Sequence, residues 1–176
     1  MNSLIGVLCR FRKEDIALSC DIEGMFHQVS VKPGDRDLLR FLWFKDDDVD
    51  AQVVTYRLTV HLFAAKSSPA CAHFTLEQTA TKYKDDYGKE ASEFVHRNFY
   101  VDDGLASVAT VEEAKHLITA SNALCRRGSF DLHKCTCSNR EELKDLPESL
   151  RDTSLLKLNL AMTTCPLRAH WELSGA

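Results

Sequence analysis

Residues 98–107 have the sequence NFYVDDGLAS, in which two adjacent acids stand between apolar runs and directly before a glycine. Strand-forming residues precede the acids, and an apolar pattern resumes after Gly104. Strand, acidic turn and strand is the simplest interpretation, with Asp102 and Asp103 at the tip of a hairpin. Two adjacent carboxylates repel each other, so either bulk water or a bound cation must compensate them. Because Asp is a common turn residue, the motif alone also allows a plain polar turn.

A further acid follows another predicted strand. Residues 16–22, IALSCDI, are typical of a buried strand that ends close to Asp21. If this strand lies beside the hairpin, Asp21, Asp102 and Asp103 converge at one edge of a sheet and raise one another's pKa values. Hard oxygen ligands favour Mg²⁺, with Mn²⁺ as an alternative. Carboxylate-bound Mg²⁺ usually also takes substrate phosphates, which indicates phosphoryl or nucleotidyl transfer by two metal ions.

Two helices are predicted around this hairpin, which we expect to span residues 94–108. The first covers residues 67–88, with Ser67 or Ser68 as its cap, Pro69 in its first turn, and Ala70, Phe74 and Thr81 facing inward. The second runs from Val111 to about Arg127, with Thr110 as its cap and Glu112 and Glu113 in its first turn.

The remaining segments complete an antiparallel sheet. Residues 38–44 and 51–63 are typical of two strands that are joined by the acidic tip 45–50. A further strand is predicted at residues 129–137 and a helical turn at residues 139–146. The order predicts an α+β fold with an antiparallel sheet and helices on one face. We expect it to be ferredoxin-like (RRM-like), with an inserted hairpin.

Composition restricts the class of protein. The 176 residues fit one domain, and the net charge of −4 argues against a nucleic-acid binder that uses its whole surface. No apolar run approaches the roughly 18 residues of a membrane span, and the N-terminus lacks the charge order of a signal peptide. We therefore expect no membrane partner and an intracellular, cytoplasmic setting, with the seven cysteines as free, partly buried thiols.

Four motifs, in order, carry a resemblance to a known family. They are CDIEGMFHQVSVKPGDRDLLRFLW from Cys20, TVHLFAAKSSPACAHF from Thr59, RNFYVDDGLASV from Arg97, and GSFDLHK from Gly128. YVDD on an apolar hairpin resembles the signature of reverse transcriptases, and the sequence of the four motifs is similar to that of BEL/Pao long-terminal-repeat retrotransposons. The resemblance runs from about Arg10 to Asn139 and returns weakly at LRAHWEL, where His170 and Trp171 match a primer-grip hairpin.

The resemblance implies an RNA-directed DNA polymerase that uses two Mg²⁺ ions. Asp21 and Asp102 would bind both ions, Asp103 would complete the acidic site, and the Ile22 carbonyl would help. Residues 1–155 would be the polymerase palm, with partial fingers at about 41–63, and residues 156–176 a poorly patterned tail. The implied partners are an RNA or DNA template with its primer, deoxynucleoside triphosphates, and the remaining fingers, thumb and RNase H parts of a polyprotein.

Substrate contacts are implied at Phe26, Phe63, Lys66, Tyr100 and Lys134. Phe26 matches the aromatic residue that excludes a ribose 2′-hydroxyl, and Phe63 and Lys66 belong to a loop that packs against the nascent base pair. Tyr100 begins the YVDD signature, and Lys134 matches a lysine proposed to protonate the pyrophosphate. From the residues alone, Phe26 fits equally well as a core side chain, and both lysines as solvated surface residues.

Departures from the family pattern leave two alternatives. Ala64 stands where related elements usually carry Gly, and Arg168 interrupts the primer-grip pattern. Because we expect the chain to be the palm of a larger polyprotein, the first alternative is a catalytically inactive remnant with at most nucleic-acid binding. The second is a metal-dependent nuclease, for which the sequence offers no separate water-activating base. Basic residues at 126–127 and between Lys32 and Arg40 are the expected contacts to the nucleic-acid backbone.

Overall fold

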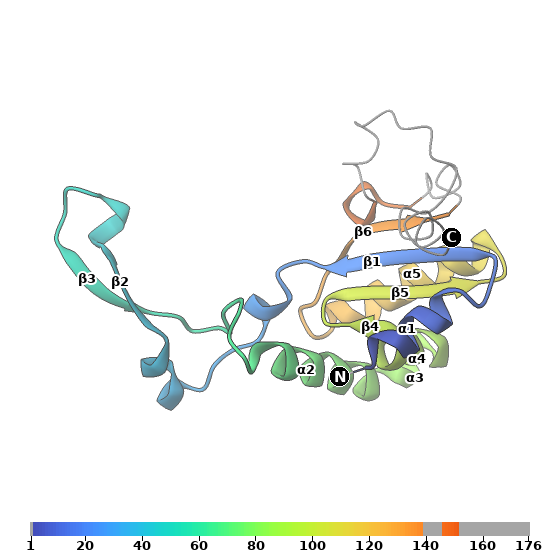
Figure 1. Cartoon of the computed structure of the whole chain (residues 1–176), viewed down its shortest axis with the longest axis horizontal. Coiled ribbons are helices and arrows are strands. Elements are labelled where there is room, and N and C mark those ends of the chain that lie inside the picture. Colours follow the sequence, from blue (N-terminus) through green and yellow to red (C-terminus); the bar gives the residue numbers. More distant parts are fainter. Residues whose placement is uncertain (1, 139–145, 152–176) are drawn as a thin grey trace, which may run out of the picture. The chain divides into compact units, whose positions relative to one another are not determined.

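The computed structural model describes residues 2–138 and 146–151 (Figure 1). The chain divides into two compact units. One comprises Met1–Glu23 with His73–Ala176, and the other comprises Gly24–Ala72.

A four-stranded sheet forms the centre of the first unit. Its strands are β1 (Ile16–Ile22), β4 (Phe99–Tyr100), β5 (Asp103–Val108) and β6 (Leu132–Cys137). Their order in the sheet is β4-β5-β1-β6, and all neighbours are antiparallel (Figure 1). The structure therefore confirms an α+β fold with an antiparallel sheet, and it confirms that the strand of Asp21 lies beside the acidic hairpin.

Five α-helices accompany the strands in the described part of the chain. They are α1 (Leu4–Phe11), α2 (Ser68–Lys82), α3 (Lys84–Tyr87), α4 (Lys89–Asn98) and α5 (Val111–Arg126). The prediction for α5 is confirmed, because the Thr110 side chain accepts a hydrogen bond from the Glu113 amide and caps the helix. A short 3₁₀ helix, Glu148–Leu150, follows β6.

The helices occupy both faces of the sheet, so the prediction that they cover one face is wrong. The face of Cys20 is covered by α4, whose Phe94 ring packs against Phe99 with ring centroids 5.2 Å apart. The opposite face is covered by α1, which places Val7 and Phe11 against Ala17 and Leu105. Successive strand residues point to opposite faces of the sheet, so Ala17 faces α1 while the next residue along β1 points to the face of Cys20.

The α2 prediction identified the helix but not its buried face. Ala70, Phe74 and Thr81 are exposed, whereas Ala72, His73, Leu76 and Ala80 are buried. The helix also ends at Lys82 rather than at residue 88. Residues 94–98 belong to α4, so the acidic hairpin begins at Phe99 and not at Phe94.

The second unit contains the predicted hairpin. Strands β2 (Arg40–Phe44) and β3 (Val53–Arg57) pair in an antiparallel ladder. The predicted acidic tip contains a 3₁₀ turn, Lys45–Asp47. Two further 3₁₀ segments, Met25–Gln28 and Pro33–Leu39, precede the hairpin.

Two findings bear on the expected setting. Six cysteines fall in the described ranges, and all six are free thiols. Among the described residues, no helix has the length and apolar character needed to cross a membrane. Two predictions lie outside the described residues. They are the helical turn expected at 139–146, of which only Leu146 is described, and the primer-grip residues His170 and Trp171.

Candidate active site

The hairpin that carries the acids closes with a two-residue turn. Tyr100 on β4 pairs with Asp103 on β5, so the turn consists of Val101 and Asp102. Asp102 therefore lies in the turn, whereas Asp103 already belongs to a strand, which corrects the expectation that both sit at the tip. Val101 adopts a φ of 58°, a left-handed conformation that is uncommon for a β-branched residue. The Ile22 amide donates to the Asp102 carbonyl at 3.1 Å and joins the turn to β1.

Gly104 follows the acids because no side chain fits there. A Cβ at this position would lie 2.7 Å from Cys20 Sγ and 2.7 Å from Phe99 Cζ. Such contacts are closer than packed atoms tolerate. The close packing below Gly104 keeps β5 against β1 at the end of the sheet that carries the acids.

Asp21 and Asp103 are partners in the ladder between β1 and β5. Residues opposite each other in antiparallel strands share one face, so both carboxylates lie on the face that α1 covers further along. Partial burial, together with the neighbouring Asp102 and Asp21 carboxylates, raises the pKa of Asp103, and Lys134 partly opposes this shift. The raised pKa of Asp103 agrees with the expected crowding of carboxylates, while the convergence of all three acids on a metal ion stays a prediction.

A β-bulge in β6 brings two further side chains to Asp21. Ser19 pairs with Thr136 but Asp21 pairs with His133, so Lys134 and Cys135 together oppose the single residue between Ser19 and Asp21. Lys134 takes a left-handed φ of 48° at this bulge. His133 Nε2 lies 3.0 Å, and Lys134 Nζ 3.6 Å, from Asp21 Oδ2.

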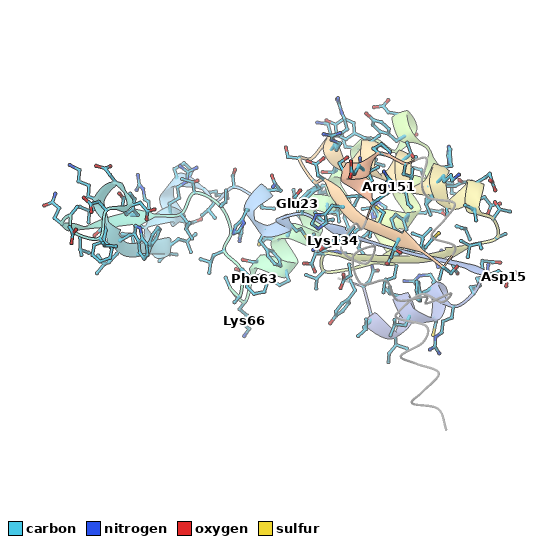
Figure 2. The ribbon with its side chains drawn as sticks, turned by 90° about the horizontal axis from the view of Figure 1, so that it is seen from above. Asp15, Glu23, Phe63, Lys66, Lys134 and Arg151 are labelled. Carbon is cyan, nitrogen blue, oxygen red and sulfur yellow. The ribbon has the colours of Figure 1, made fainter. Side chains whose placement is uncertain are left out.

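Glu23 lies next to this group at the end of β1. Its Oε2 lies 4.0 Å from His133 Nδ1, and its amide donates to the Asp131 carbonyl at 3.0 Å. Figure 2 shows Glu23 and Lys134 at the same end of the unit. The site therefore combines carboxylates with cationic or hydrogen-bonding groups.

His133 is the residue that sequence analysis missed. In a regular strand His133 and Lys134 would point to opposite faces, so only one could meet Asp21. The bulge removes this restriction, and a bulge is set by pairing with β1 rather than by a local motif. The one sequence signal for His133 was its position directly before Lys134, which the resemblance had already identified as a candidate site residue.

The donors at this site fit Mg²⁺ by their chemistry. Three carboxylates and a backbone carbonyl are hard oxygen ligands, and a cation would relieve the crowding that raises the pKa of Asp103. Among the described residues, no three His, Cys, Asp or Glu side chains are grouped so as to hold a metal ion. Asp21 is instead bound to His133 and Lys134. At least one side chain would have to change rotamer to complete a metal site.

The predicted substrate residues fall into the two units. Tyr100 and Lys134 belong to the unit of the acids, and Tyr100 packs beside the α1 cluster. Phe26, Phe63 and Lys66 belong to the unit Gly24–Ala72. Phe26 is buried and its ring lies 5.9 Å from that of Phe63, which is 73% exposed. The interior position expected as one alternative for Phe26 is thus confirmed, while its contact with a sugar stays a prediction.

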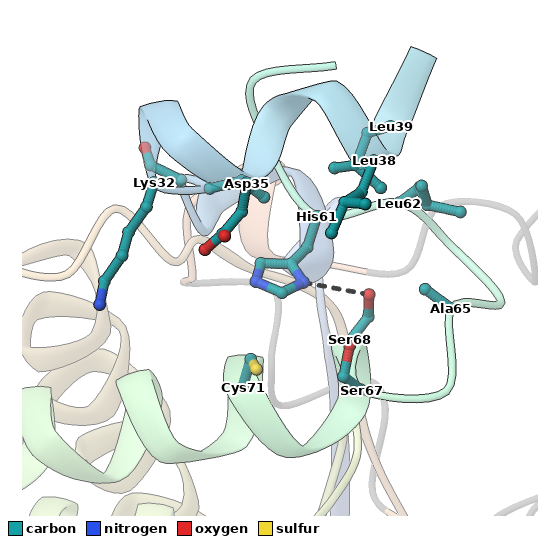
Figure 3. A pocket seen from close by; sticks show the side chains of 12 residues that line it. Lys32, Asp35, Leu38, Leu39, His61, Leu62, Ala65, Ser67, Ser68 and Cys71 are labelled. Atoms are coloured by element: carbon teal, nitrogen blue, oxygen red, sulfur yellow. Dashed lines mark hydrogen bonds between the residues drawn. The ribbon is translucent and has the colours of Figure 1, made fainter. Parts of the chain in front are cut away.

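The loop between β3 and α2 borders a pocket of about 440 Å³ within the second unit (Figure 3). His61 Nδ1 lies 3.3 Å from Ser68 Oγ there, at the start of α2. Lys66 is exposed. Ala64 adopts a φ of 67°, the left-handed region that favours glycine. Ala64, which stands where the resemblance implies a glycine, therefore has a backbone conformation that glycine adopts more readily than alanine.

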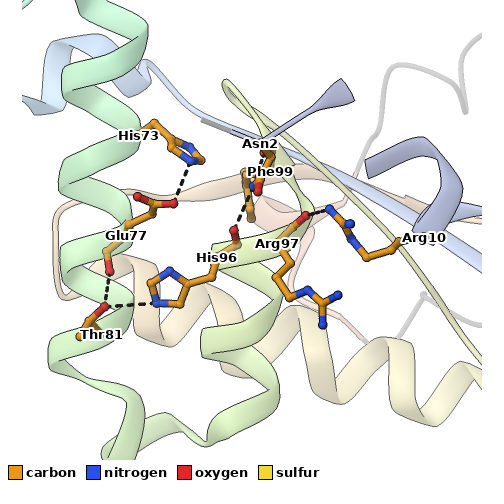
Figure 4. A network of polar contacts seen from close by, with 8 residues as sticks. All are labelled: Asn2, Arg10, His73, Glu77, Thr81, His96, Arg97 and Phe99. Carbon is orange, nitrogen blue, oxygen red and sulfur yellow. Dashed lines mark hydrogen bonds and ion pairs between the residues drawn. The ribbon is translucent and has the colours of Figure 1, made fainter. Parts of the chain in front are cut away.

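A network of polar contacts fixes the base of the acidic hairpin (Figure 4). The Asn2 side chain donates to the carbonyls of His96 and Phe99 at 3.0 and 2.9 Å, where α4 passes into β4. The Arg10 guanidinium donates to the Arg97 carbonyl. Together these bonds tie the N-terminal segment to the strand that leads to the turn.

Four of the arginines assigned to phosphate contacts already have protein partners. They are Arg126 with Asp131, Arg127 over the Tyr83 ring, Arg36 with the Val31 carbonyl, and Arg40 with the Asp37 carbonyl. A nucleic-acid backbone would have to share or displace these contacts, so the assignment stays a prediction.

No protein-family model matches this sequence, and no curated protein matches it.

Proposed function

We propose that the chain is the palm, with part of the fingers, of a reverse transcriptase of the BEL/Pao retrotransposon type. The observation that carries the proposal is the pairing of Asp21 with Asp103 on adjacent strands, with Asp102 in the turn between β4 and β5. The four motifs that resemble the family lie in family order around this arrangement. An isolated DD turn would not explain a second acid at the matching position of the neighbouring strand.

The connectivity supports the same proposal. Strand β1 is followed by helices, then β4 and β5, then helix α5 and β6, and the strands lie in the order β4-β5-β1-β6. This is the order of a ferredoxin-like split βαβ sheet, the fold expected for a polymerase palm. The hairpin of β2 and β3 is an insertion between β1 and β4, where the proposal assigns the partial fingers.

The proposed reaction adds a deoxynucleotide to a primer 3′-hydroxyl. The hydroxyl oxygen attacks the α-phosphate of a deoxynucleoside triphosphate, and pyrophosphate leaves. Asp21, Asp102, Asp103 and the Ile22 carbonyl would hold two Mg²⁺ ions, which lower the pKa of the hydroxyl and neutralise the charge on the phosphates. Lys134 lies beside the acids and would donate a proton to the leaving pyrophosphate. The resemblance further implies substrate contacts for Phe26, Phe63, Lys66 and Tyr100, and this part of the proposal rests on the sequence alone.

A second candidate is a non-catalytic palm that binds nucleic acid at most. Its specific support is the Asp21 carboxylate, which is bound to His133 and Lys134, and the lack of a grouped metal-ligand set among the described residues. In that case the same fold would persist without a productive metal site.

Primer extension separates these candidates. The 176-residue chain is incubated with a labelled primer on an RNA template, deoxynucleoside triphosphates and Mg²⁺ or Mn²⁺, beside Asp102→Asn. Asp85→Asn is the matched control, because it removes the same charge at an exposed site on α3. We expect extension by the wild type and the control and none by Asp102→Asn. Folded protein without extension favours the non-catalytic palm, and primer shortening that requires Asp102 indicates a nuclease.

A further inference from the structure

The bulge in β6 gives Asp21 a second polar neighbour that a regular strand would not provide. His133 and Lys134 are adjacent in sequence, yet both reach the same oxygen, Asp21 Oδ2. Within the described residues, both of these contacts to the carboxylate use Oδ2, which leaves Oδ1 for another ligand.

The two neighbours differ in how firmly they are held. The His133 side chain is 21% exposed and lies 3.0 Å from Oδ2, whereas the Lys134 side chain is 58% exposed and lies 3.6 Å away. A lysine with four rotatable bonds in water constrains its partner weakly. The imidazole is the shorter and less solvated contact, so it is better placed than the lysine to orient the carboxylate.

The backbone around the imidazole is held by a bond between strand ends. The Glu23 amide donates to the Asp131 carbonyl at 3.0 Å and fixes the ends of β1 and β6 together, whereas Glu23 Oε2, 4.0 Å from His133 Nδ1, is too far away for a hydrogen bond. Carboxylates that bind metal ions are commonly oriented by hydrogen-bonded neighbours.

We propose that His133 is a positioning residue that holds Asp21 through Oδ2 and presents Oδ1 to a bound metal ion. This inference rests on the proposed function, because it assigns the metal ion to the acidic site. A neutral imidazole that donates through Nε2 is sufficient for this role. His133 and a cation then act together rather than in competition.

The test measures Mn²⁺ alone, without substrate. Free Mn²⁺ is followed by electron paramagnetic resonance at pH 8. The variants are His133→Ala, His133→Gln, which keeps a donor near the position of Nε2, and Asp21→Asn. His116→Ala is the matched control, because His116 is exposed on α5. Circular dichroism establishes that each variant is folded, and His133→Leu replaces the alanine variant if the cavity unfolds it.

Loss of an orienting neighbour typically weakens metal binding about 10- to 100-fold. We expect a loss of about this size for His133→Ala, a clearly smaller loss for His133→Gln, and no change for His116→Ala. Unchanged or tighter Mn²⁺ binding by His133→Ala, with binding abolished in Asp21→Asn, would overturn the inference and leave the proposed function intact. Tighter binding would mean that His133 competes with the metal ion. Mn²⁺ binding that does not depend on Asp21 would refute both.

Discussion

Replacing Ala64 by glycine is expected to stabilise the unit Gly24–Ala72. Ala64 has a φ of 67° and is exposed, so removing its methyl group relieves backbone strain and loses little burial. A left-handed conformation costs a residue with a Cβ roughly 1–2 kcal/mol. Glycine returns roughly 0.4–1 kcal/mol of this through the greater freedom of the unfolded chain. The difference is a gain of about 1 kcal/mol, or roughly a fivefold change in the unfolding equilibrium.

Urea denaturation followed by the fluorescence of Trp43 measures this gain. Trp43 lies on β2 in the same unit, and Trp171→Phe removes the other tryptophan of the chain. With a urea slope of about 1 kcal/mol/M, the midpoint is expected to rise by about 1 M. Ala70→Gly is the matched control. It makes the same chemical change at an exposed position of α2, where helix propensity predicts a loss of about 1 kcal/mol.

The two glycine variants should therefore shift the midpoint in opposite directions. A fall in the midpoint for Ala64→Gly, similar to that for Ala70→Gly, would refute the assignment of strain to Ala64. It would also remove the physical reason for regarding Ala64 as a costly departure from the family glycine.

Three further predictions concern the unit of the acids. Burial and neighbouring carboxylates raise the pKa of Asp103 above 3.8, so ionisation of Asp103 lowers the stability of the fold as pH rises through the raised pKa. Asp103→Asn should therefore raise the metal-free melting temperature at pH 7 and have little effect at pH 3. Equal effects at both pH values would contradict this. Gly104→Ala should cost about 1–3 kcal/mol in chemical denaturation by crowding Cys20 and Phe99, and adding Cys20→Ala should recover part of the loss. Burial lowers the pKa of His73, so as pH falls below 6.5 the unfolded chain binds a proton more readily than the folded state does. The free energy of unfolding should therefore decrease below pH 6.5, and His73→Leu should flatten this pH dependence.

Local signals in the sequence were sufficient for several elements. The strand Ile16–Ile22 has the predicted bounds, and α5 begins at the predicted cap because the Thr110 hydroxyl satisfies a free amide of the first turn. Helix α1 was not predicted, although its residues carry a helical pattern. Leu4, Val7, Leu8 and Phe11 follow the i, i+3, i+4, i+7 spacing, and Val7 and Phe11 are its buried residues.

Other features depended on packing between distant segments. The exposed Phe74 and the buried His73 on α2 show that polarity alone did not identify the inward face, because helix burial is decided by which neighbours pack there. The boundary between α4 and the acidic hairpin was misplaced by five residues for a similar reason: Phe94 and Phe99 are both apolar, yet one belongs to a helix and the other to a strand.

Residue patterns alone were enough to predict the strands that carry the acids, the identity of those acids and the chemistry that carboxylate oxygens favour. The folded structure was needed to show that Asp21 is opposite Asp103, that Asp103 belongs to a strand rather than to the turn, and that His133 joins Lys134 at Asp21 Oδ2. These three features follow from strand register. One additional residue in β6 changes which side chains share a face, and register is fixed by pairing with a distant strand rather than by neighbouring residues.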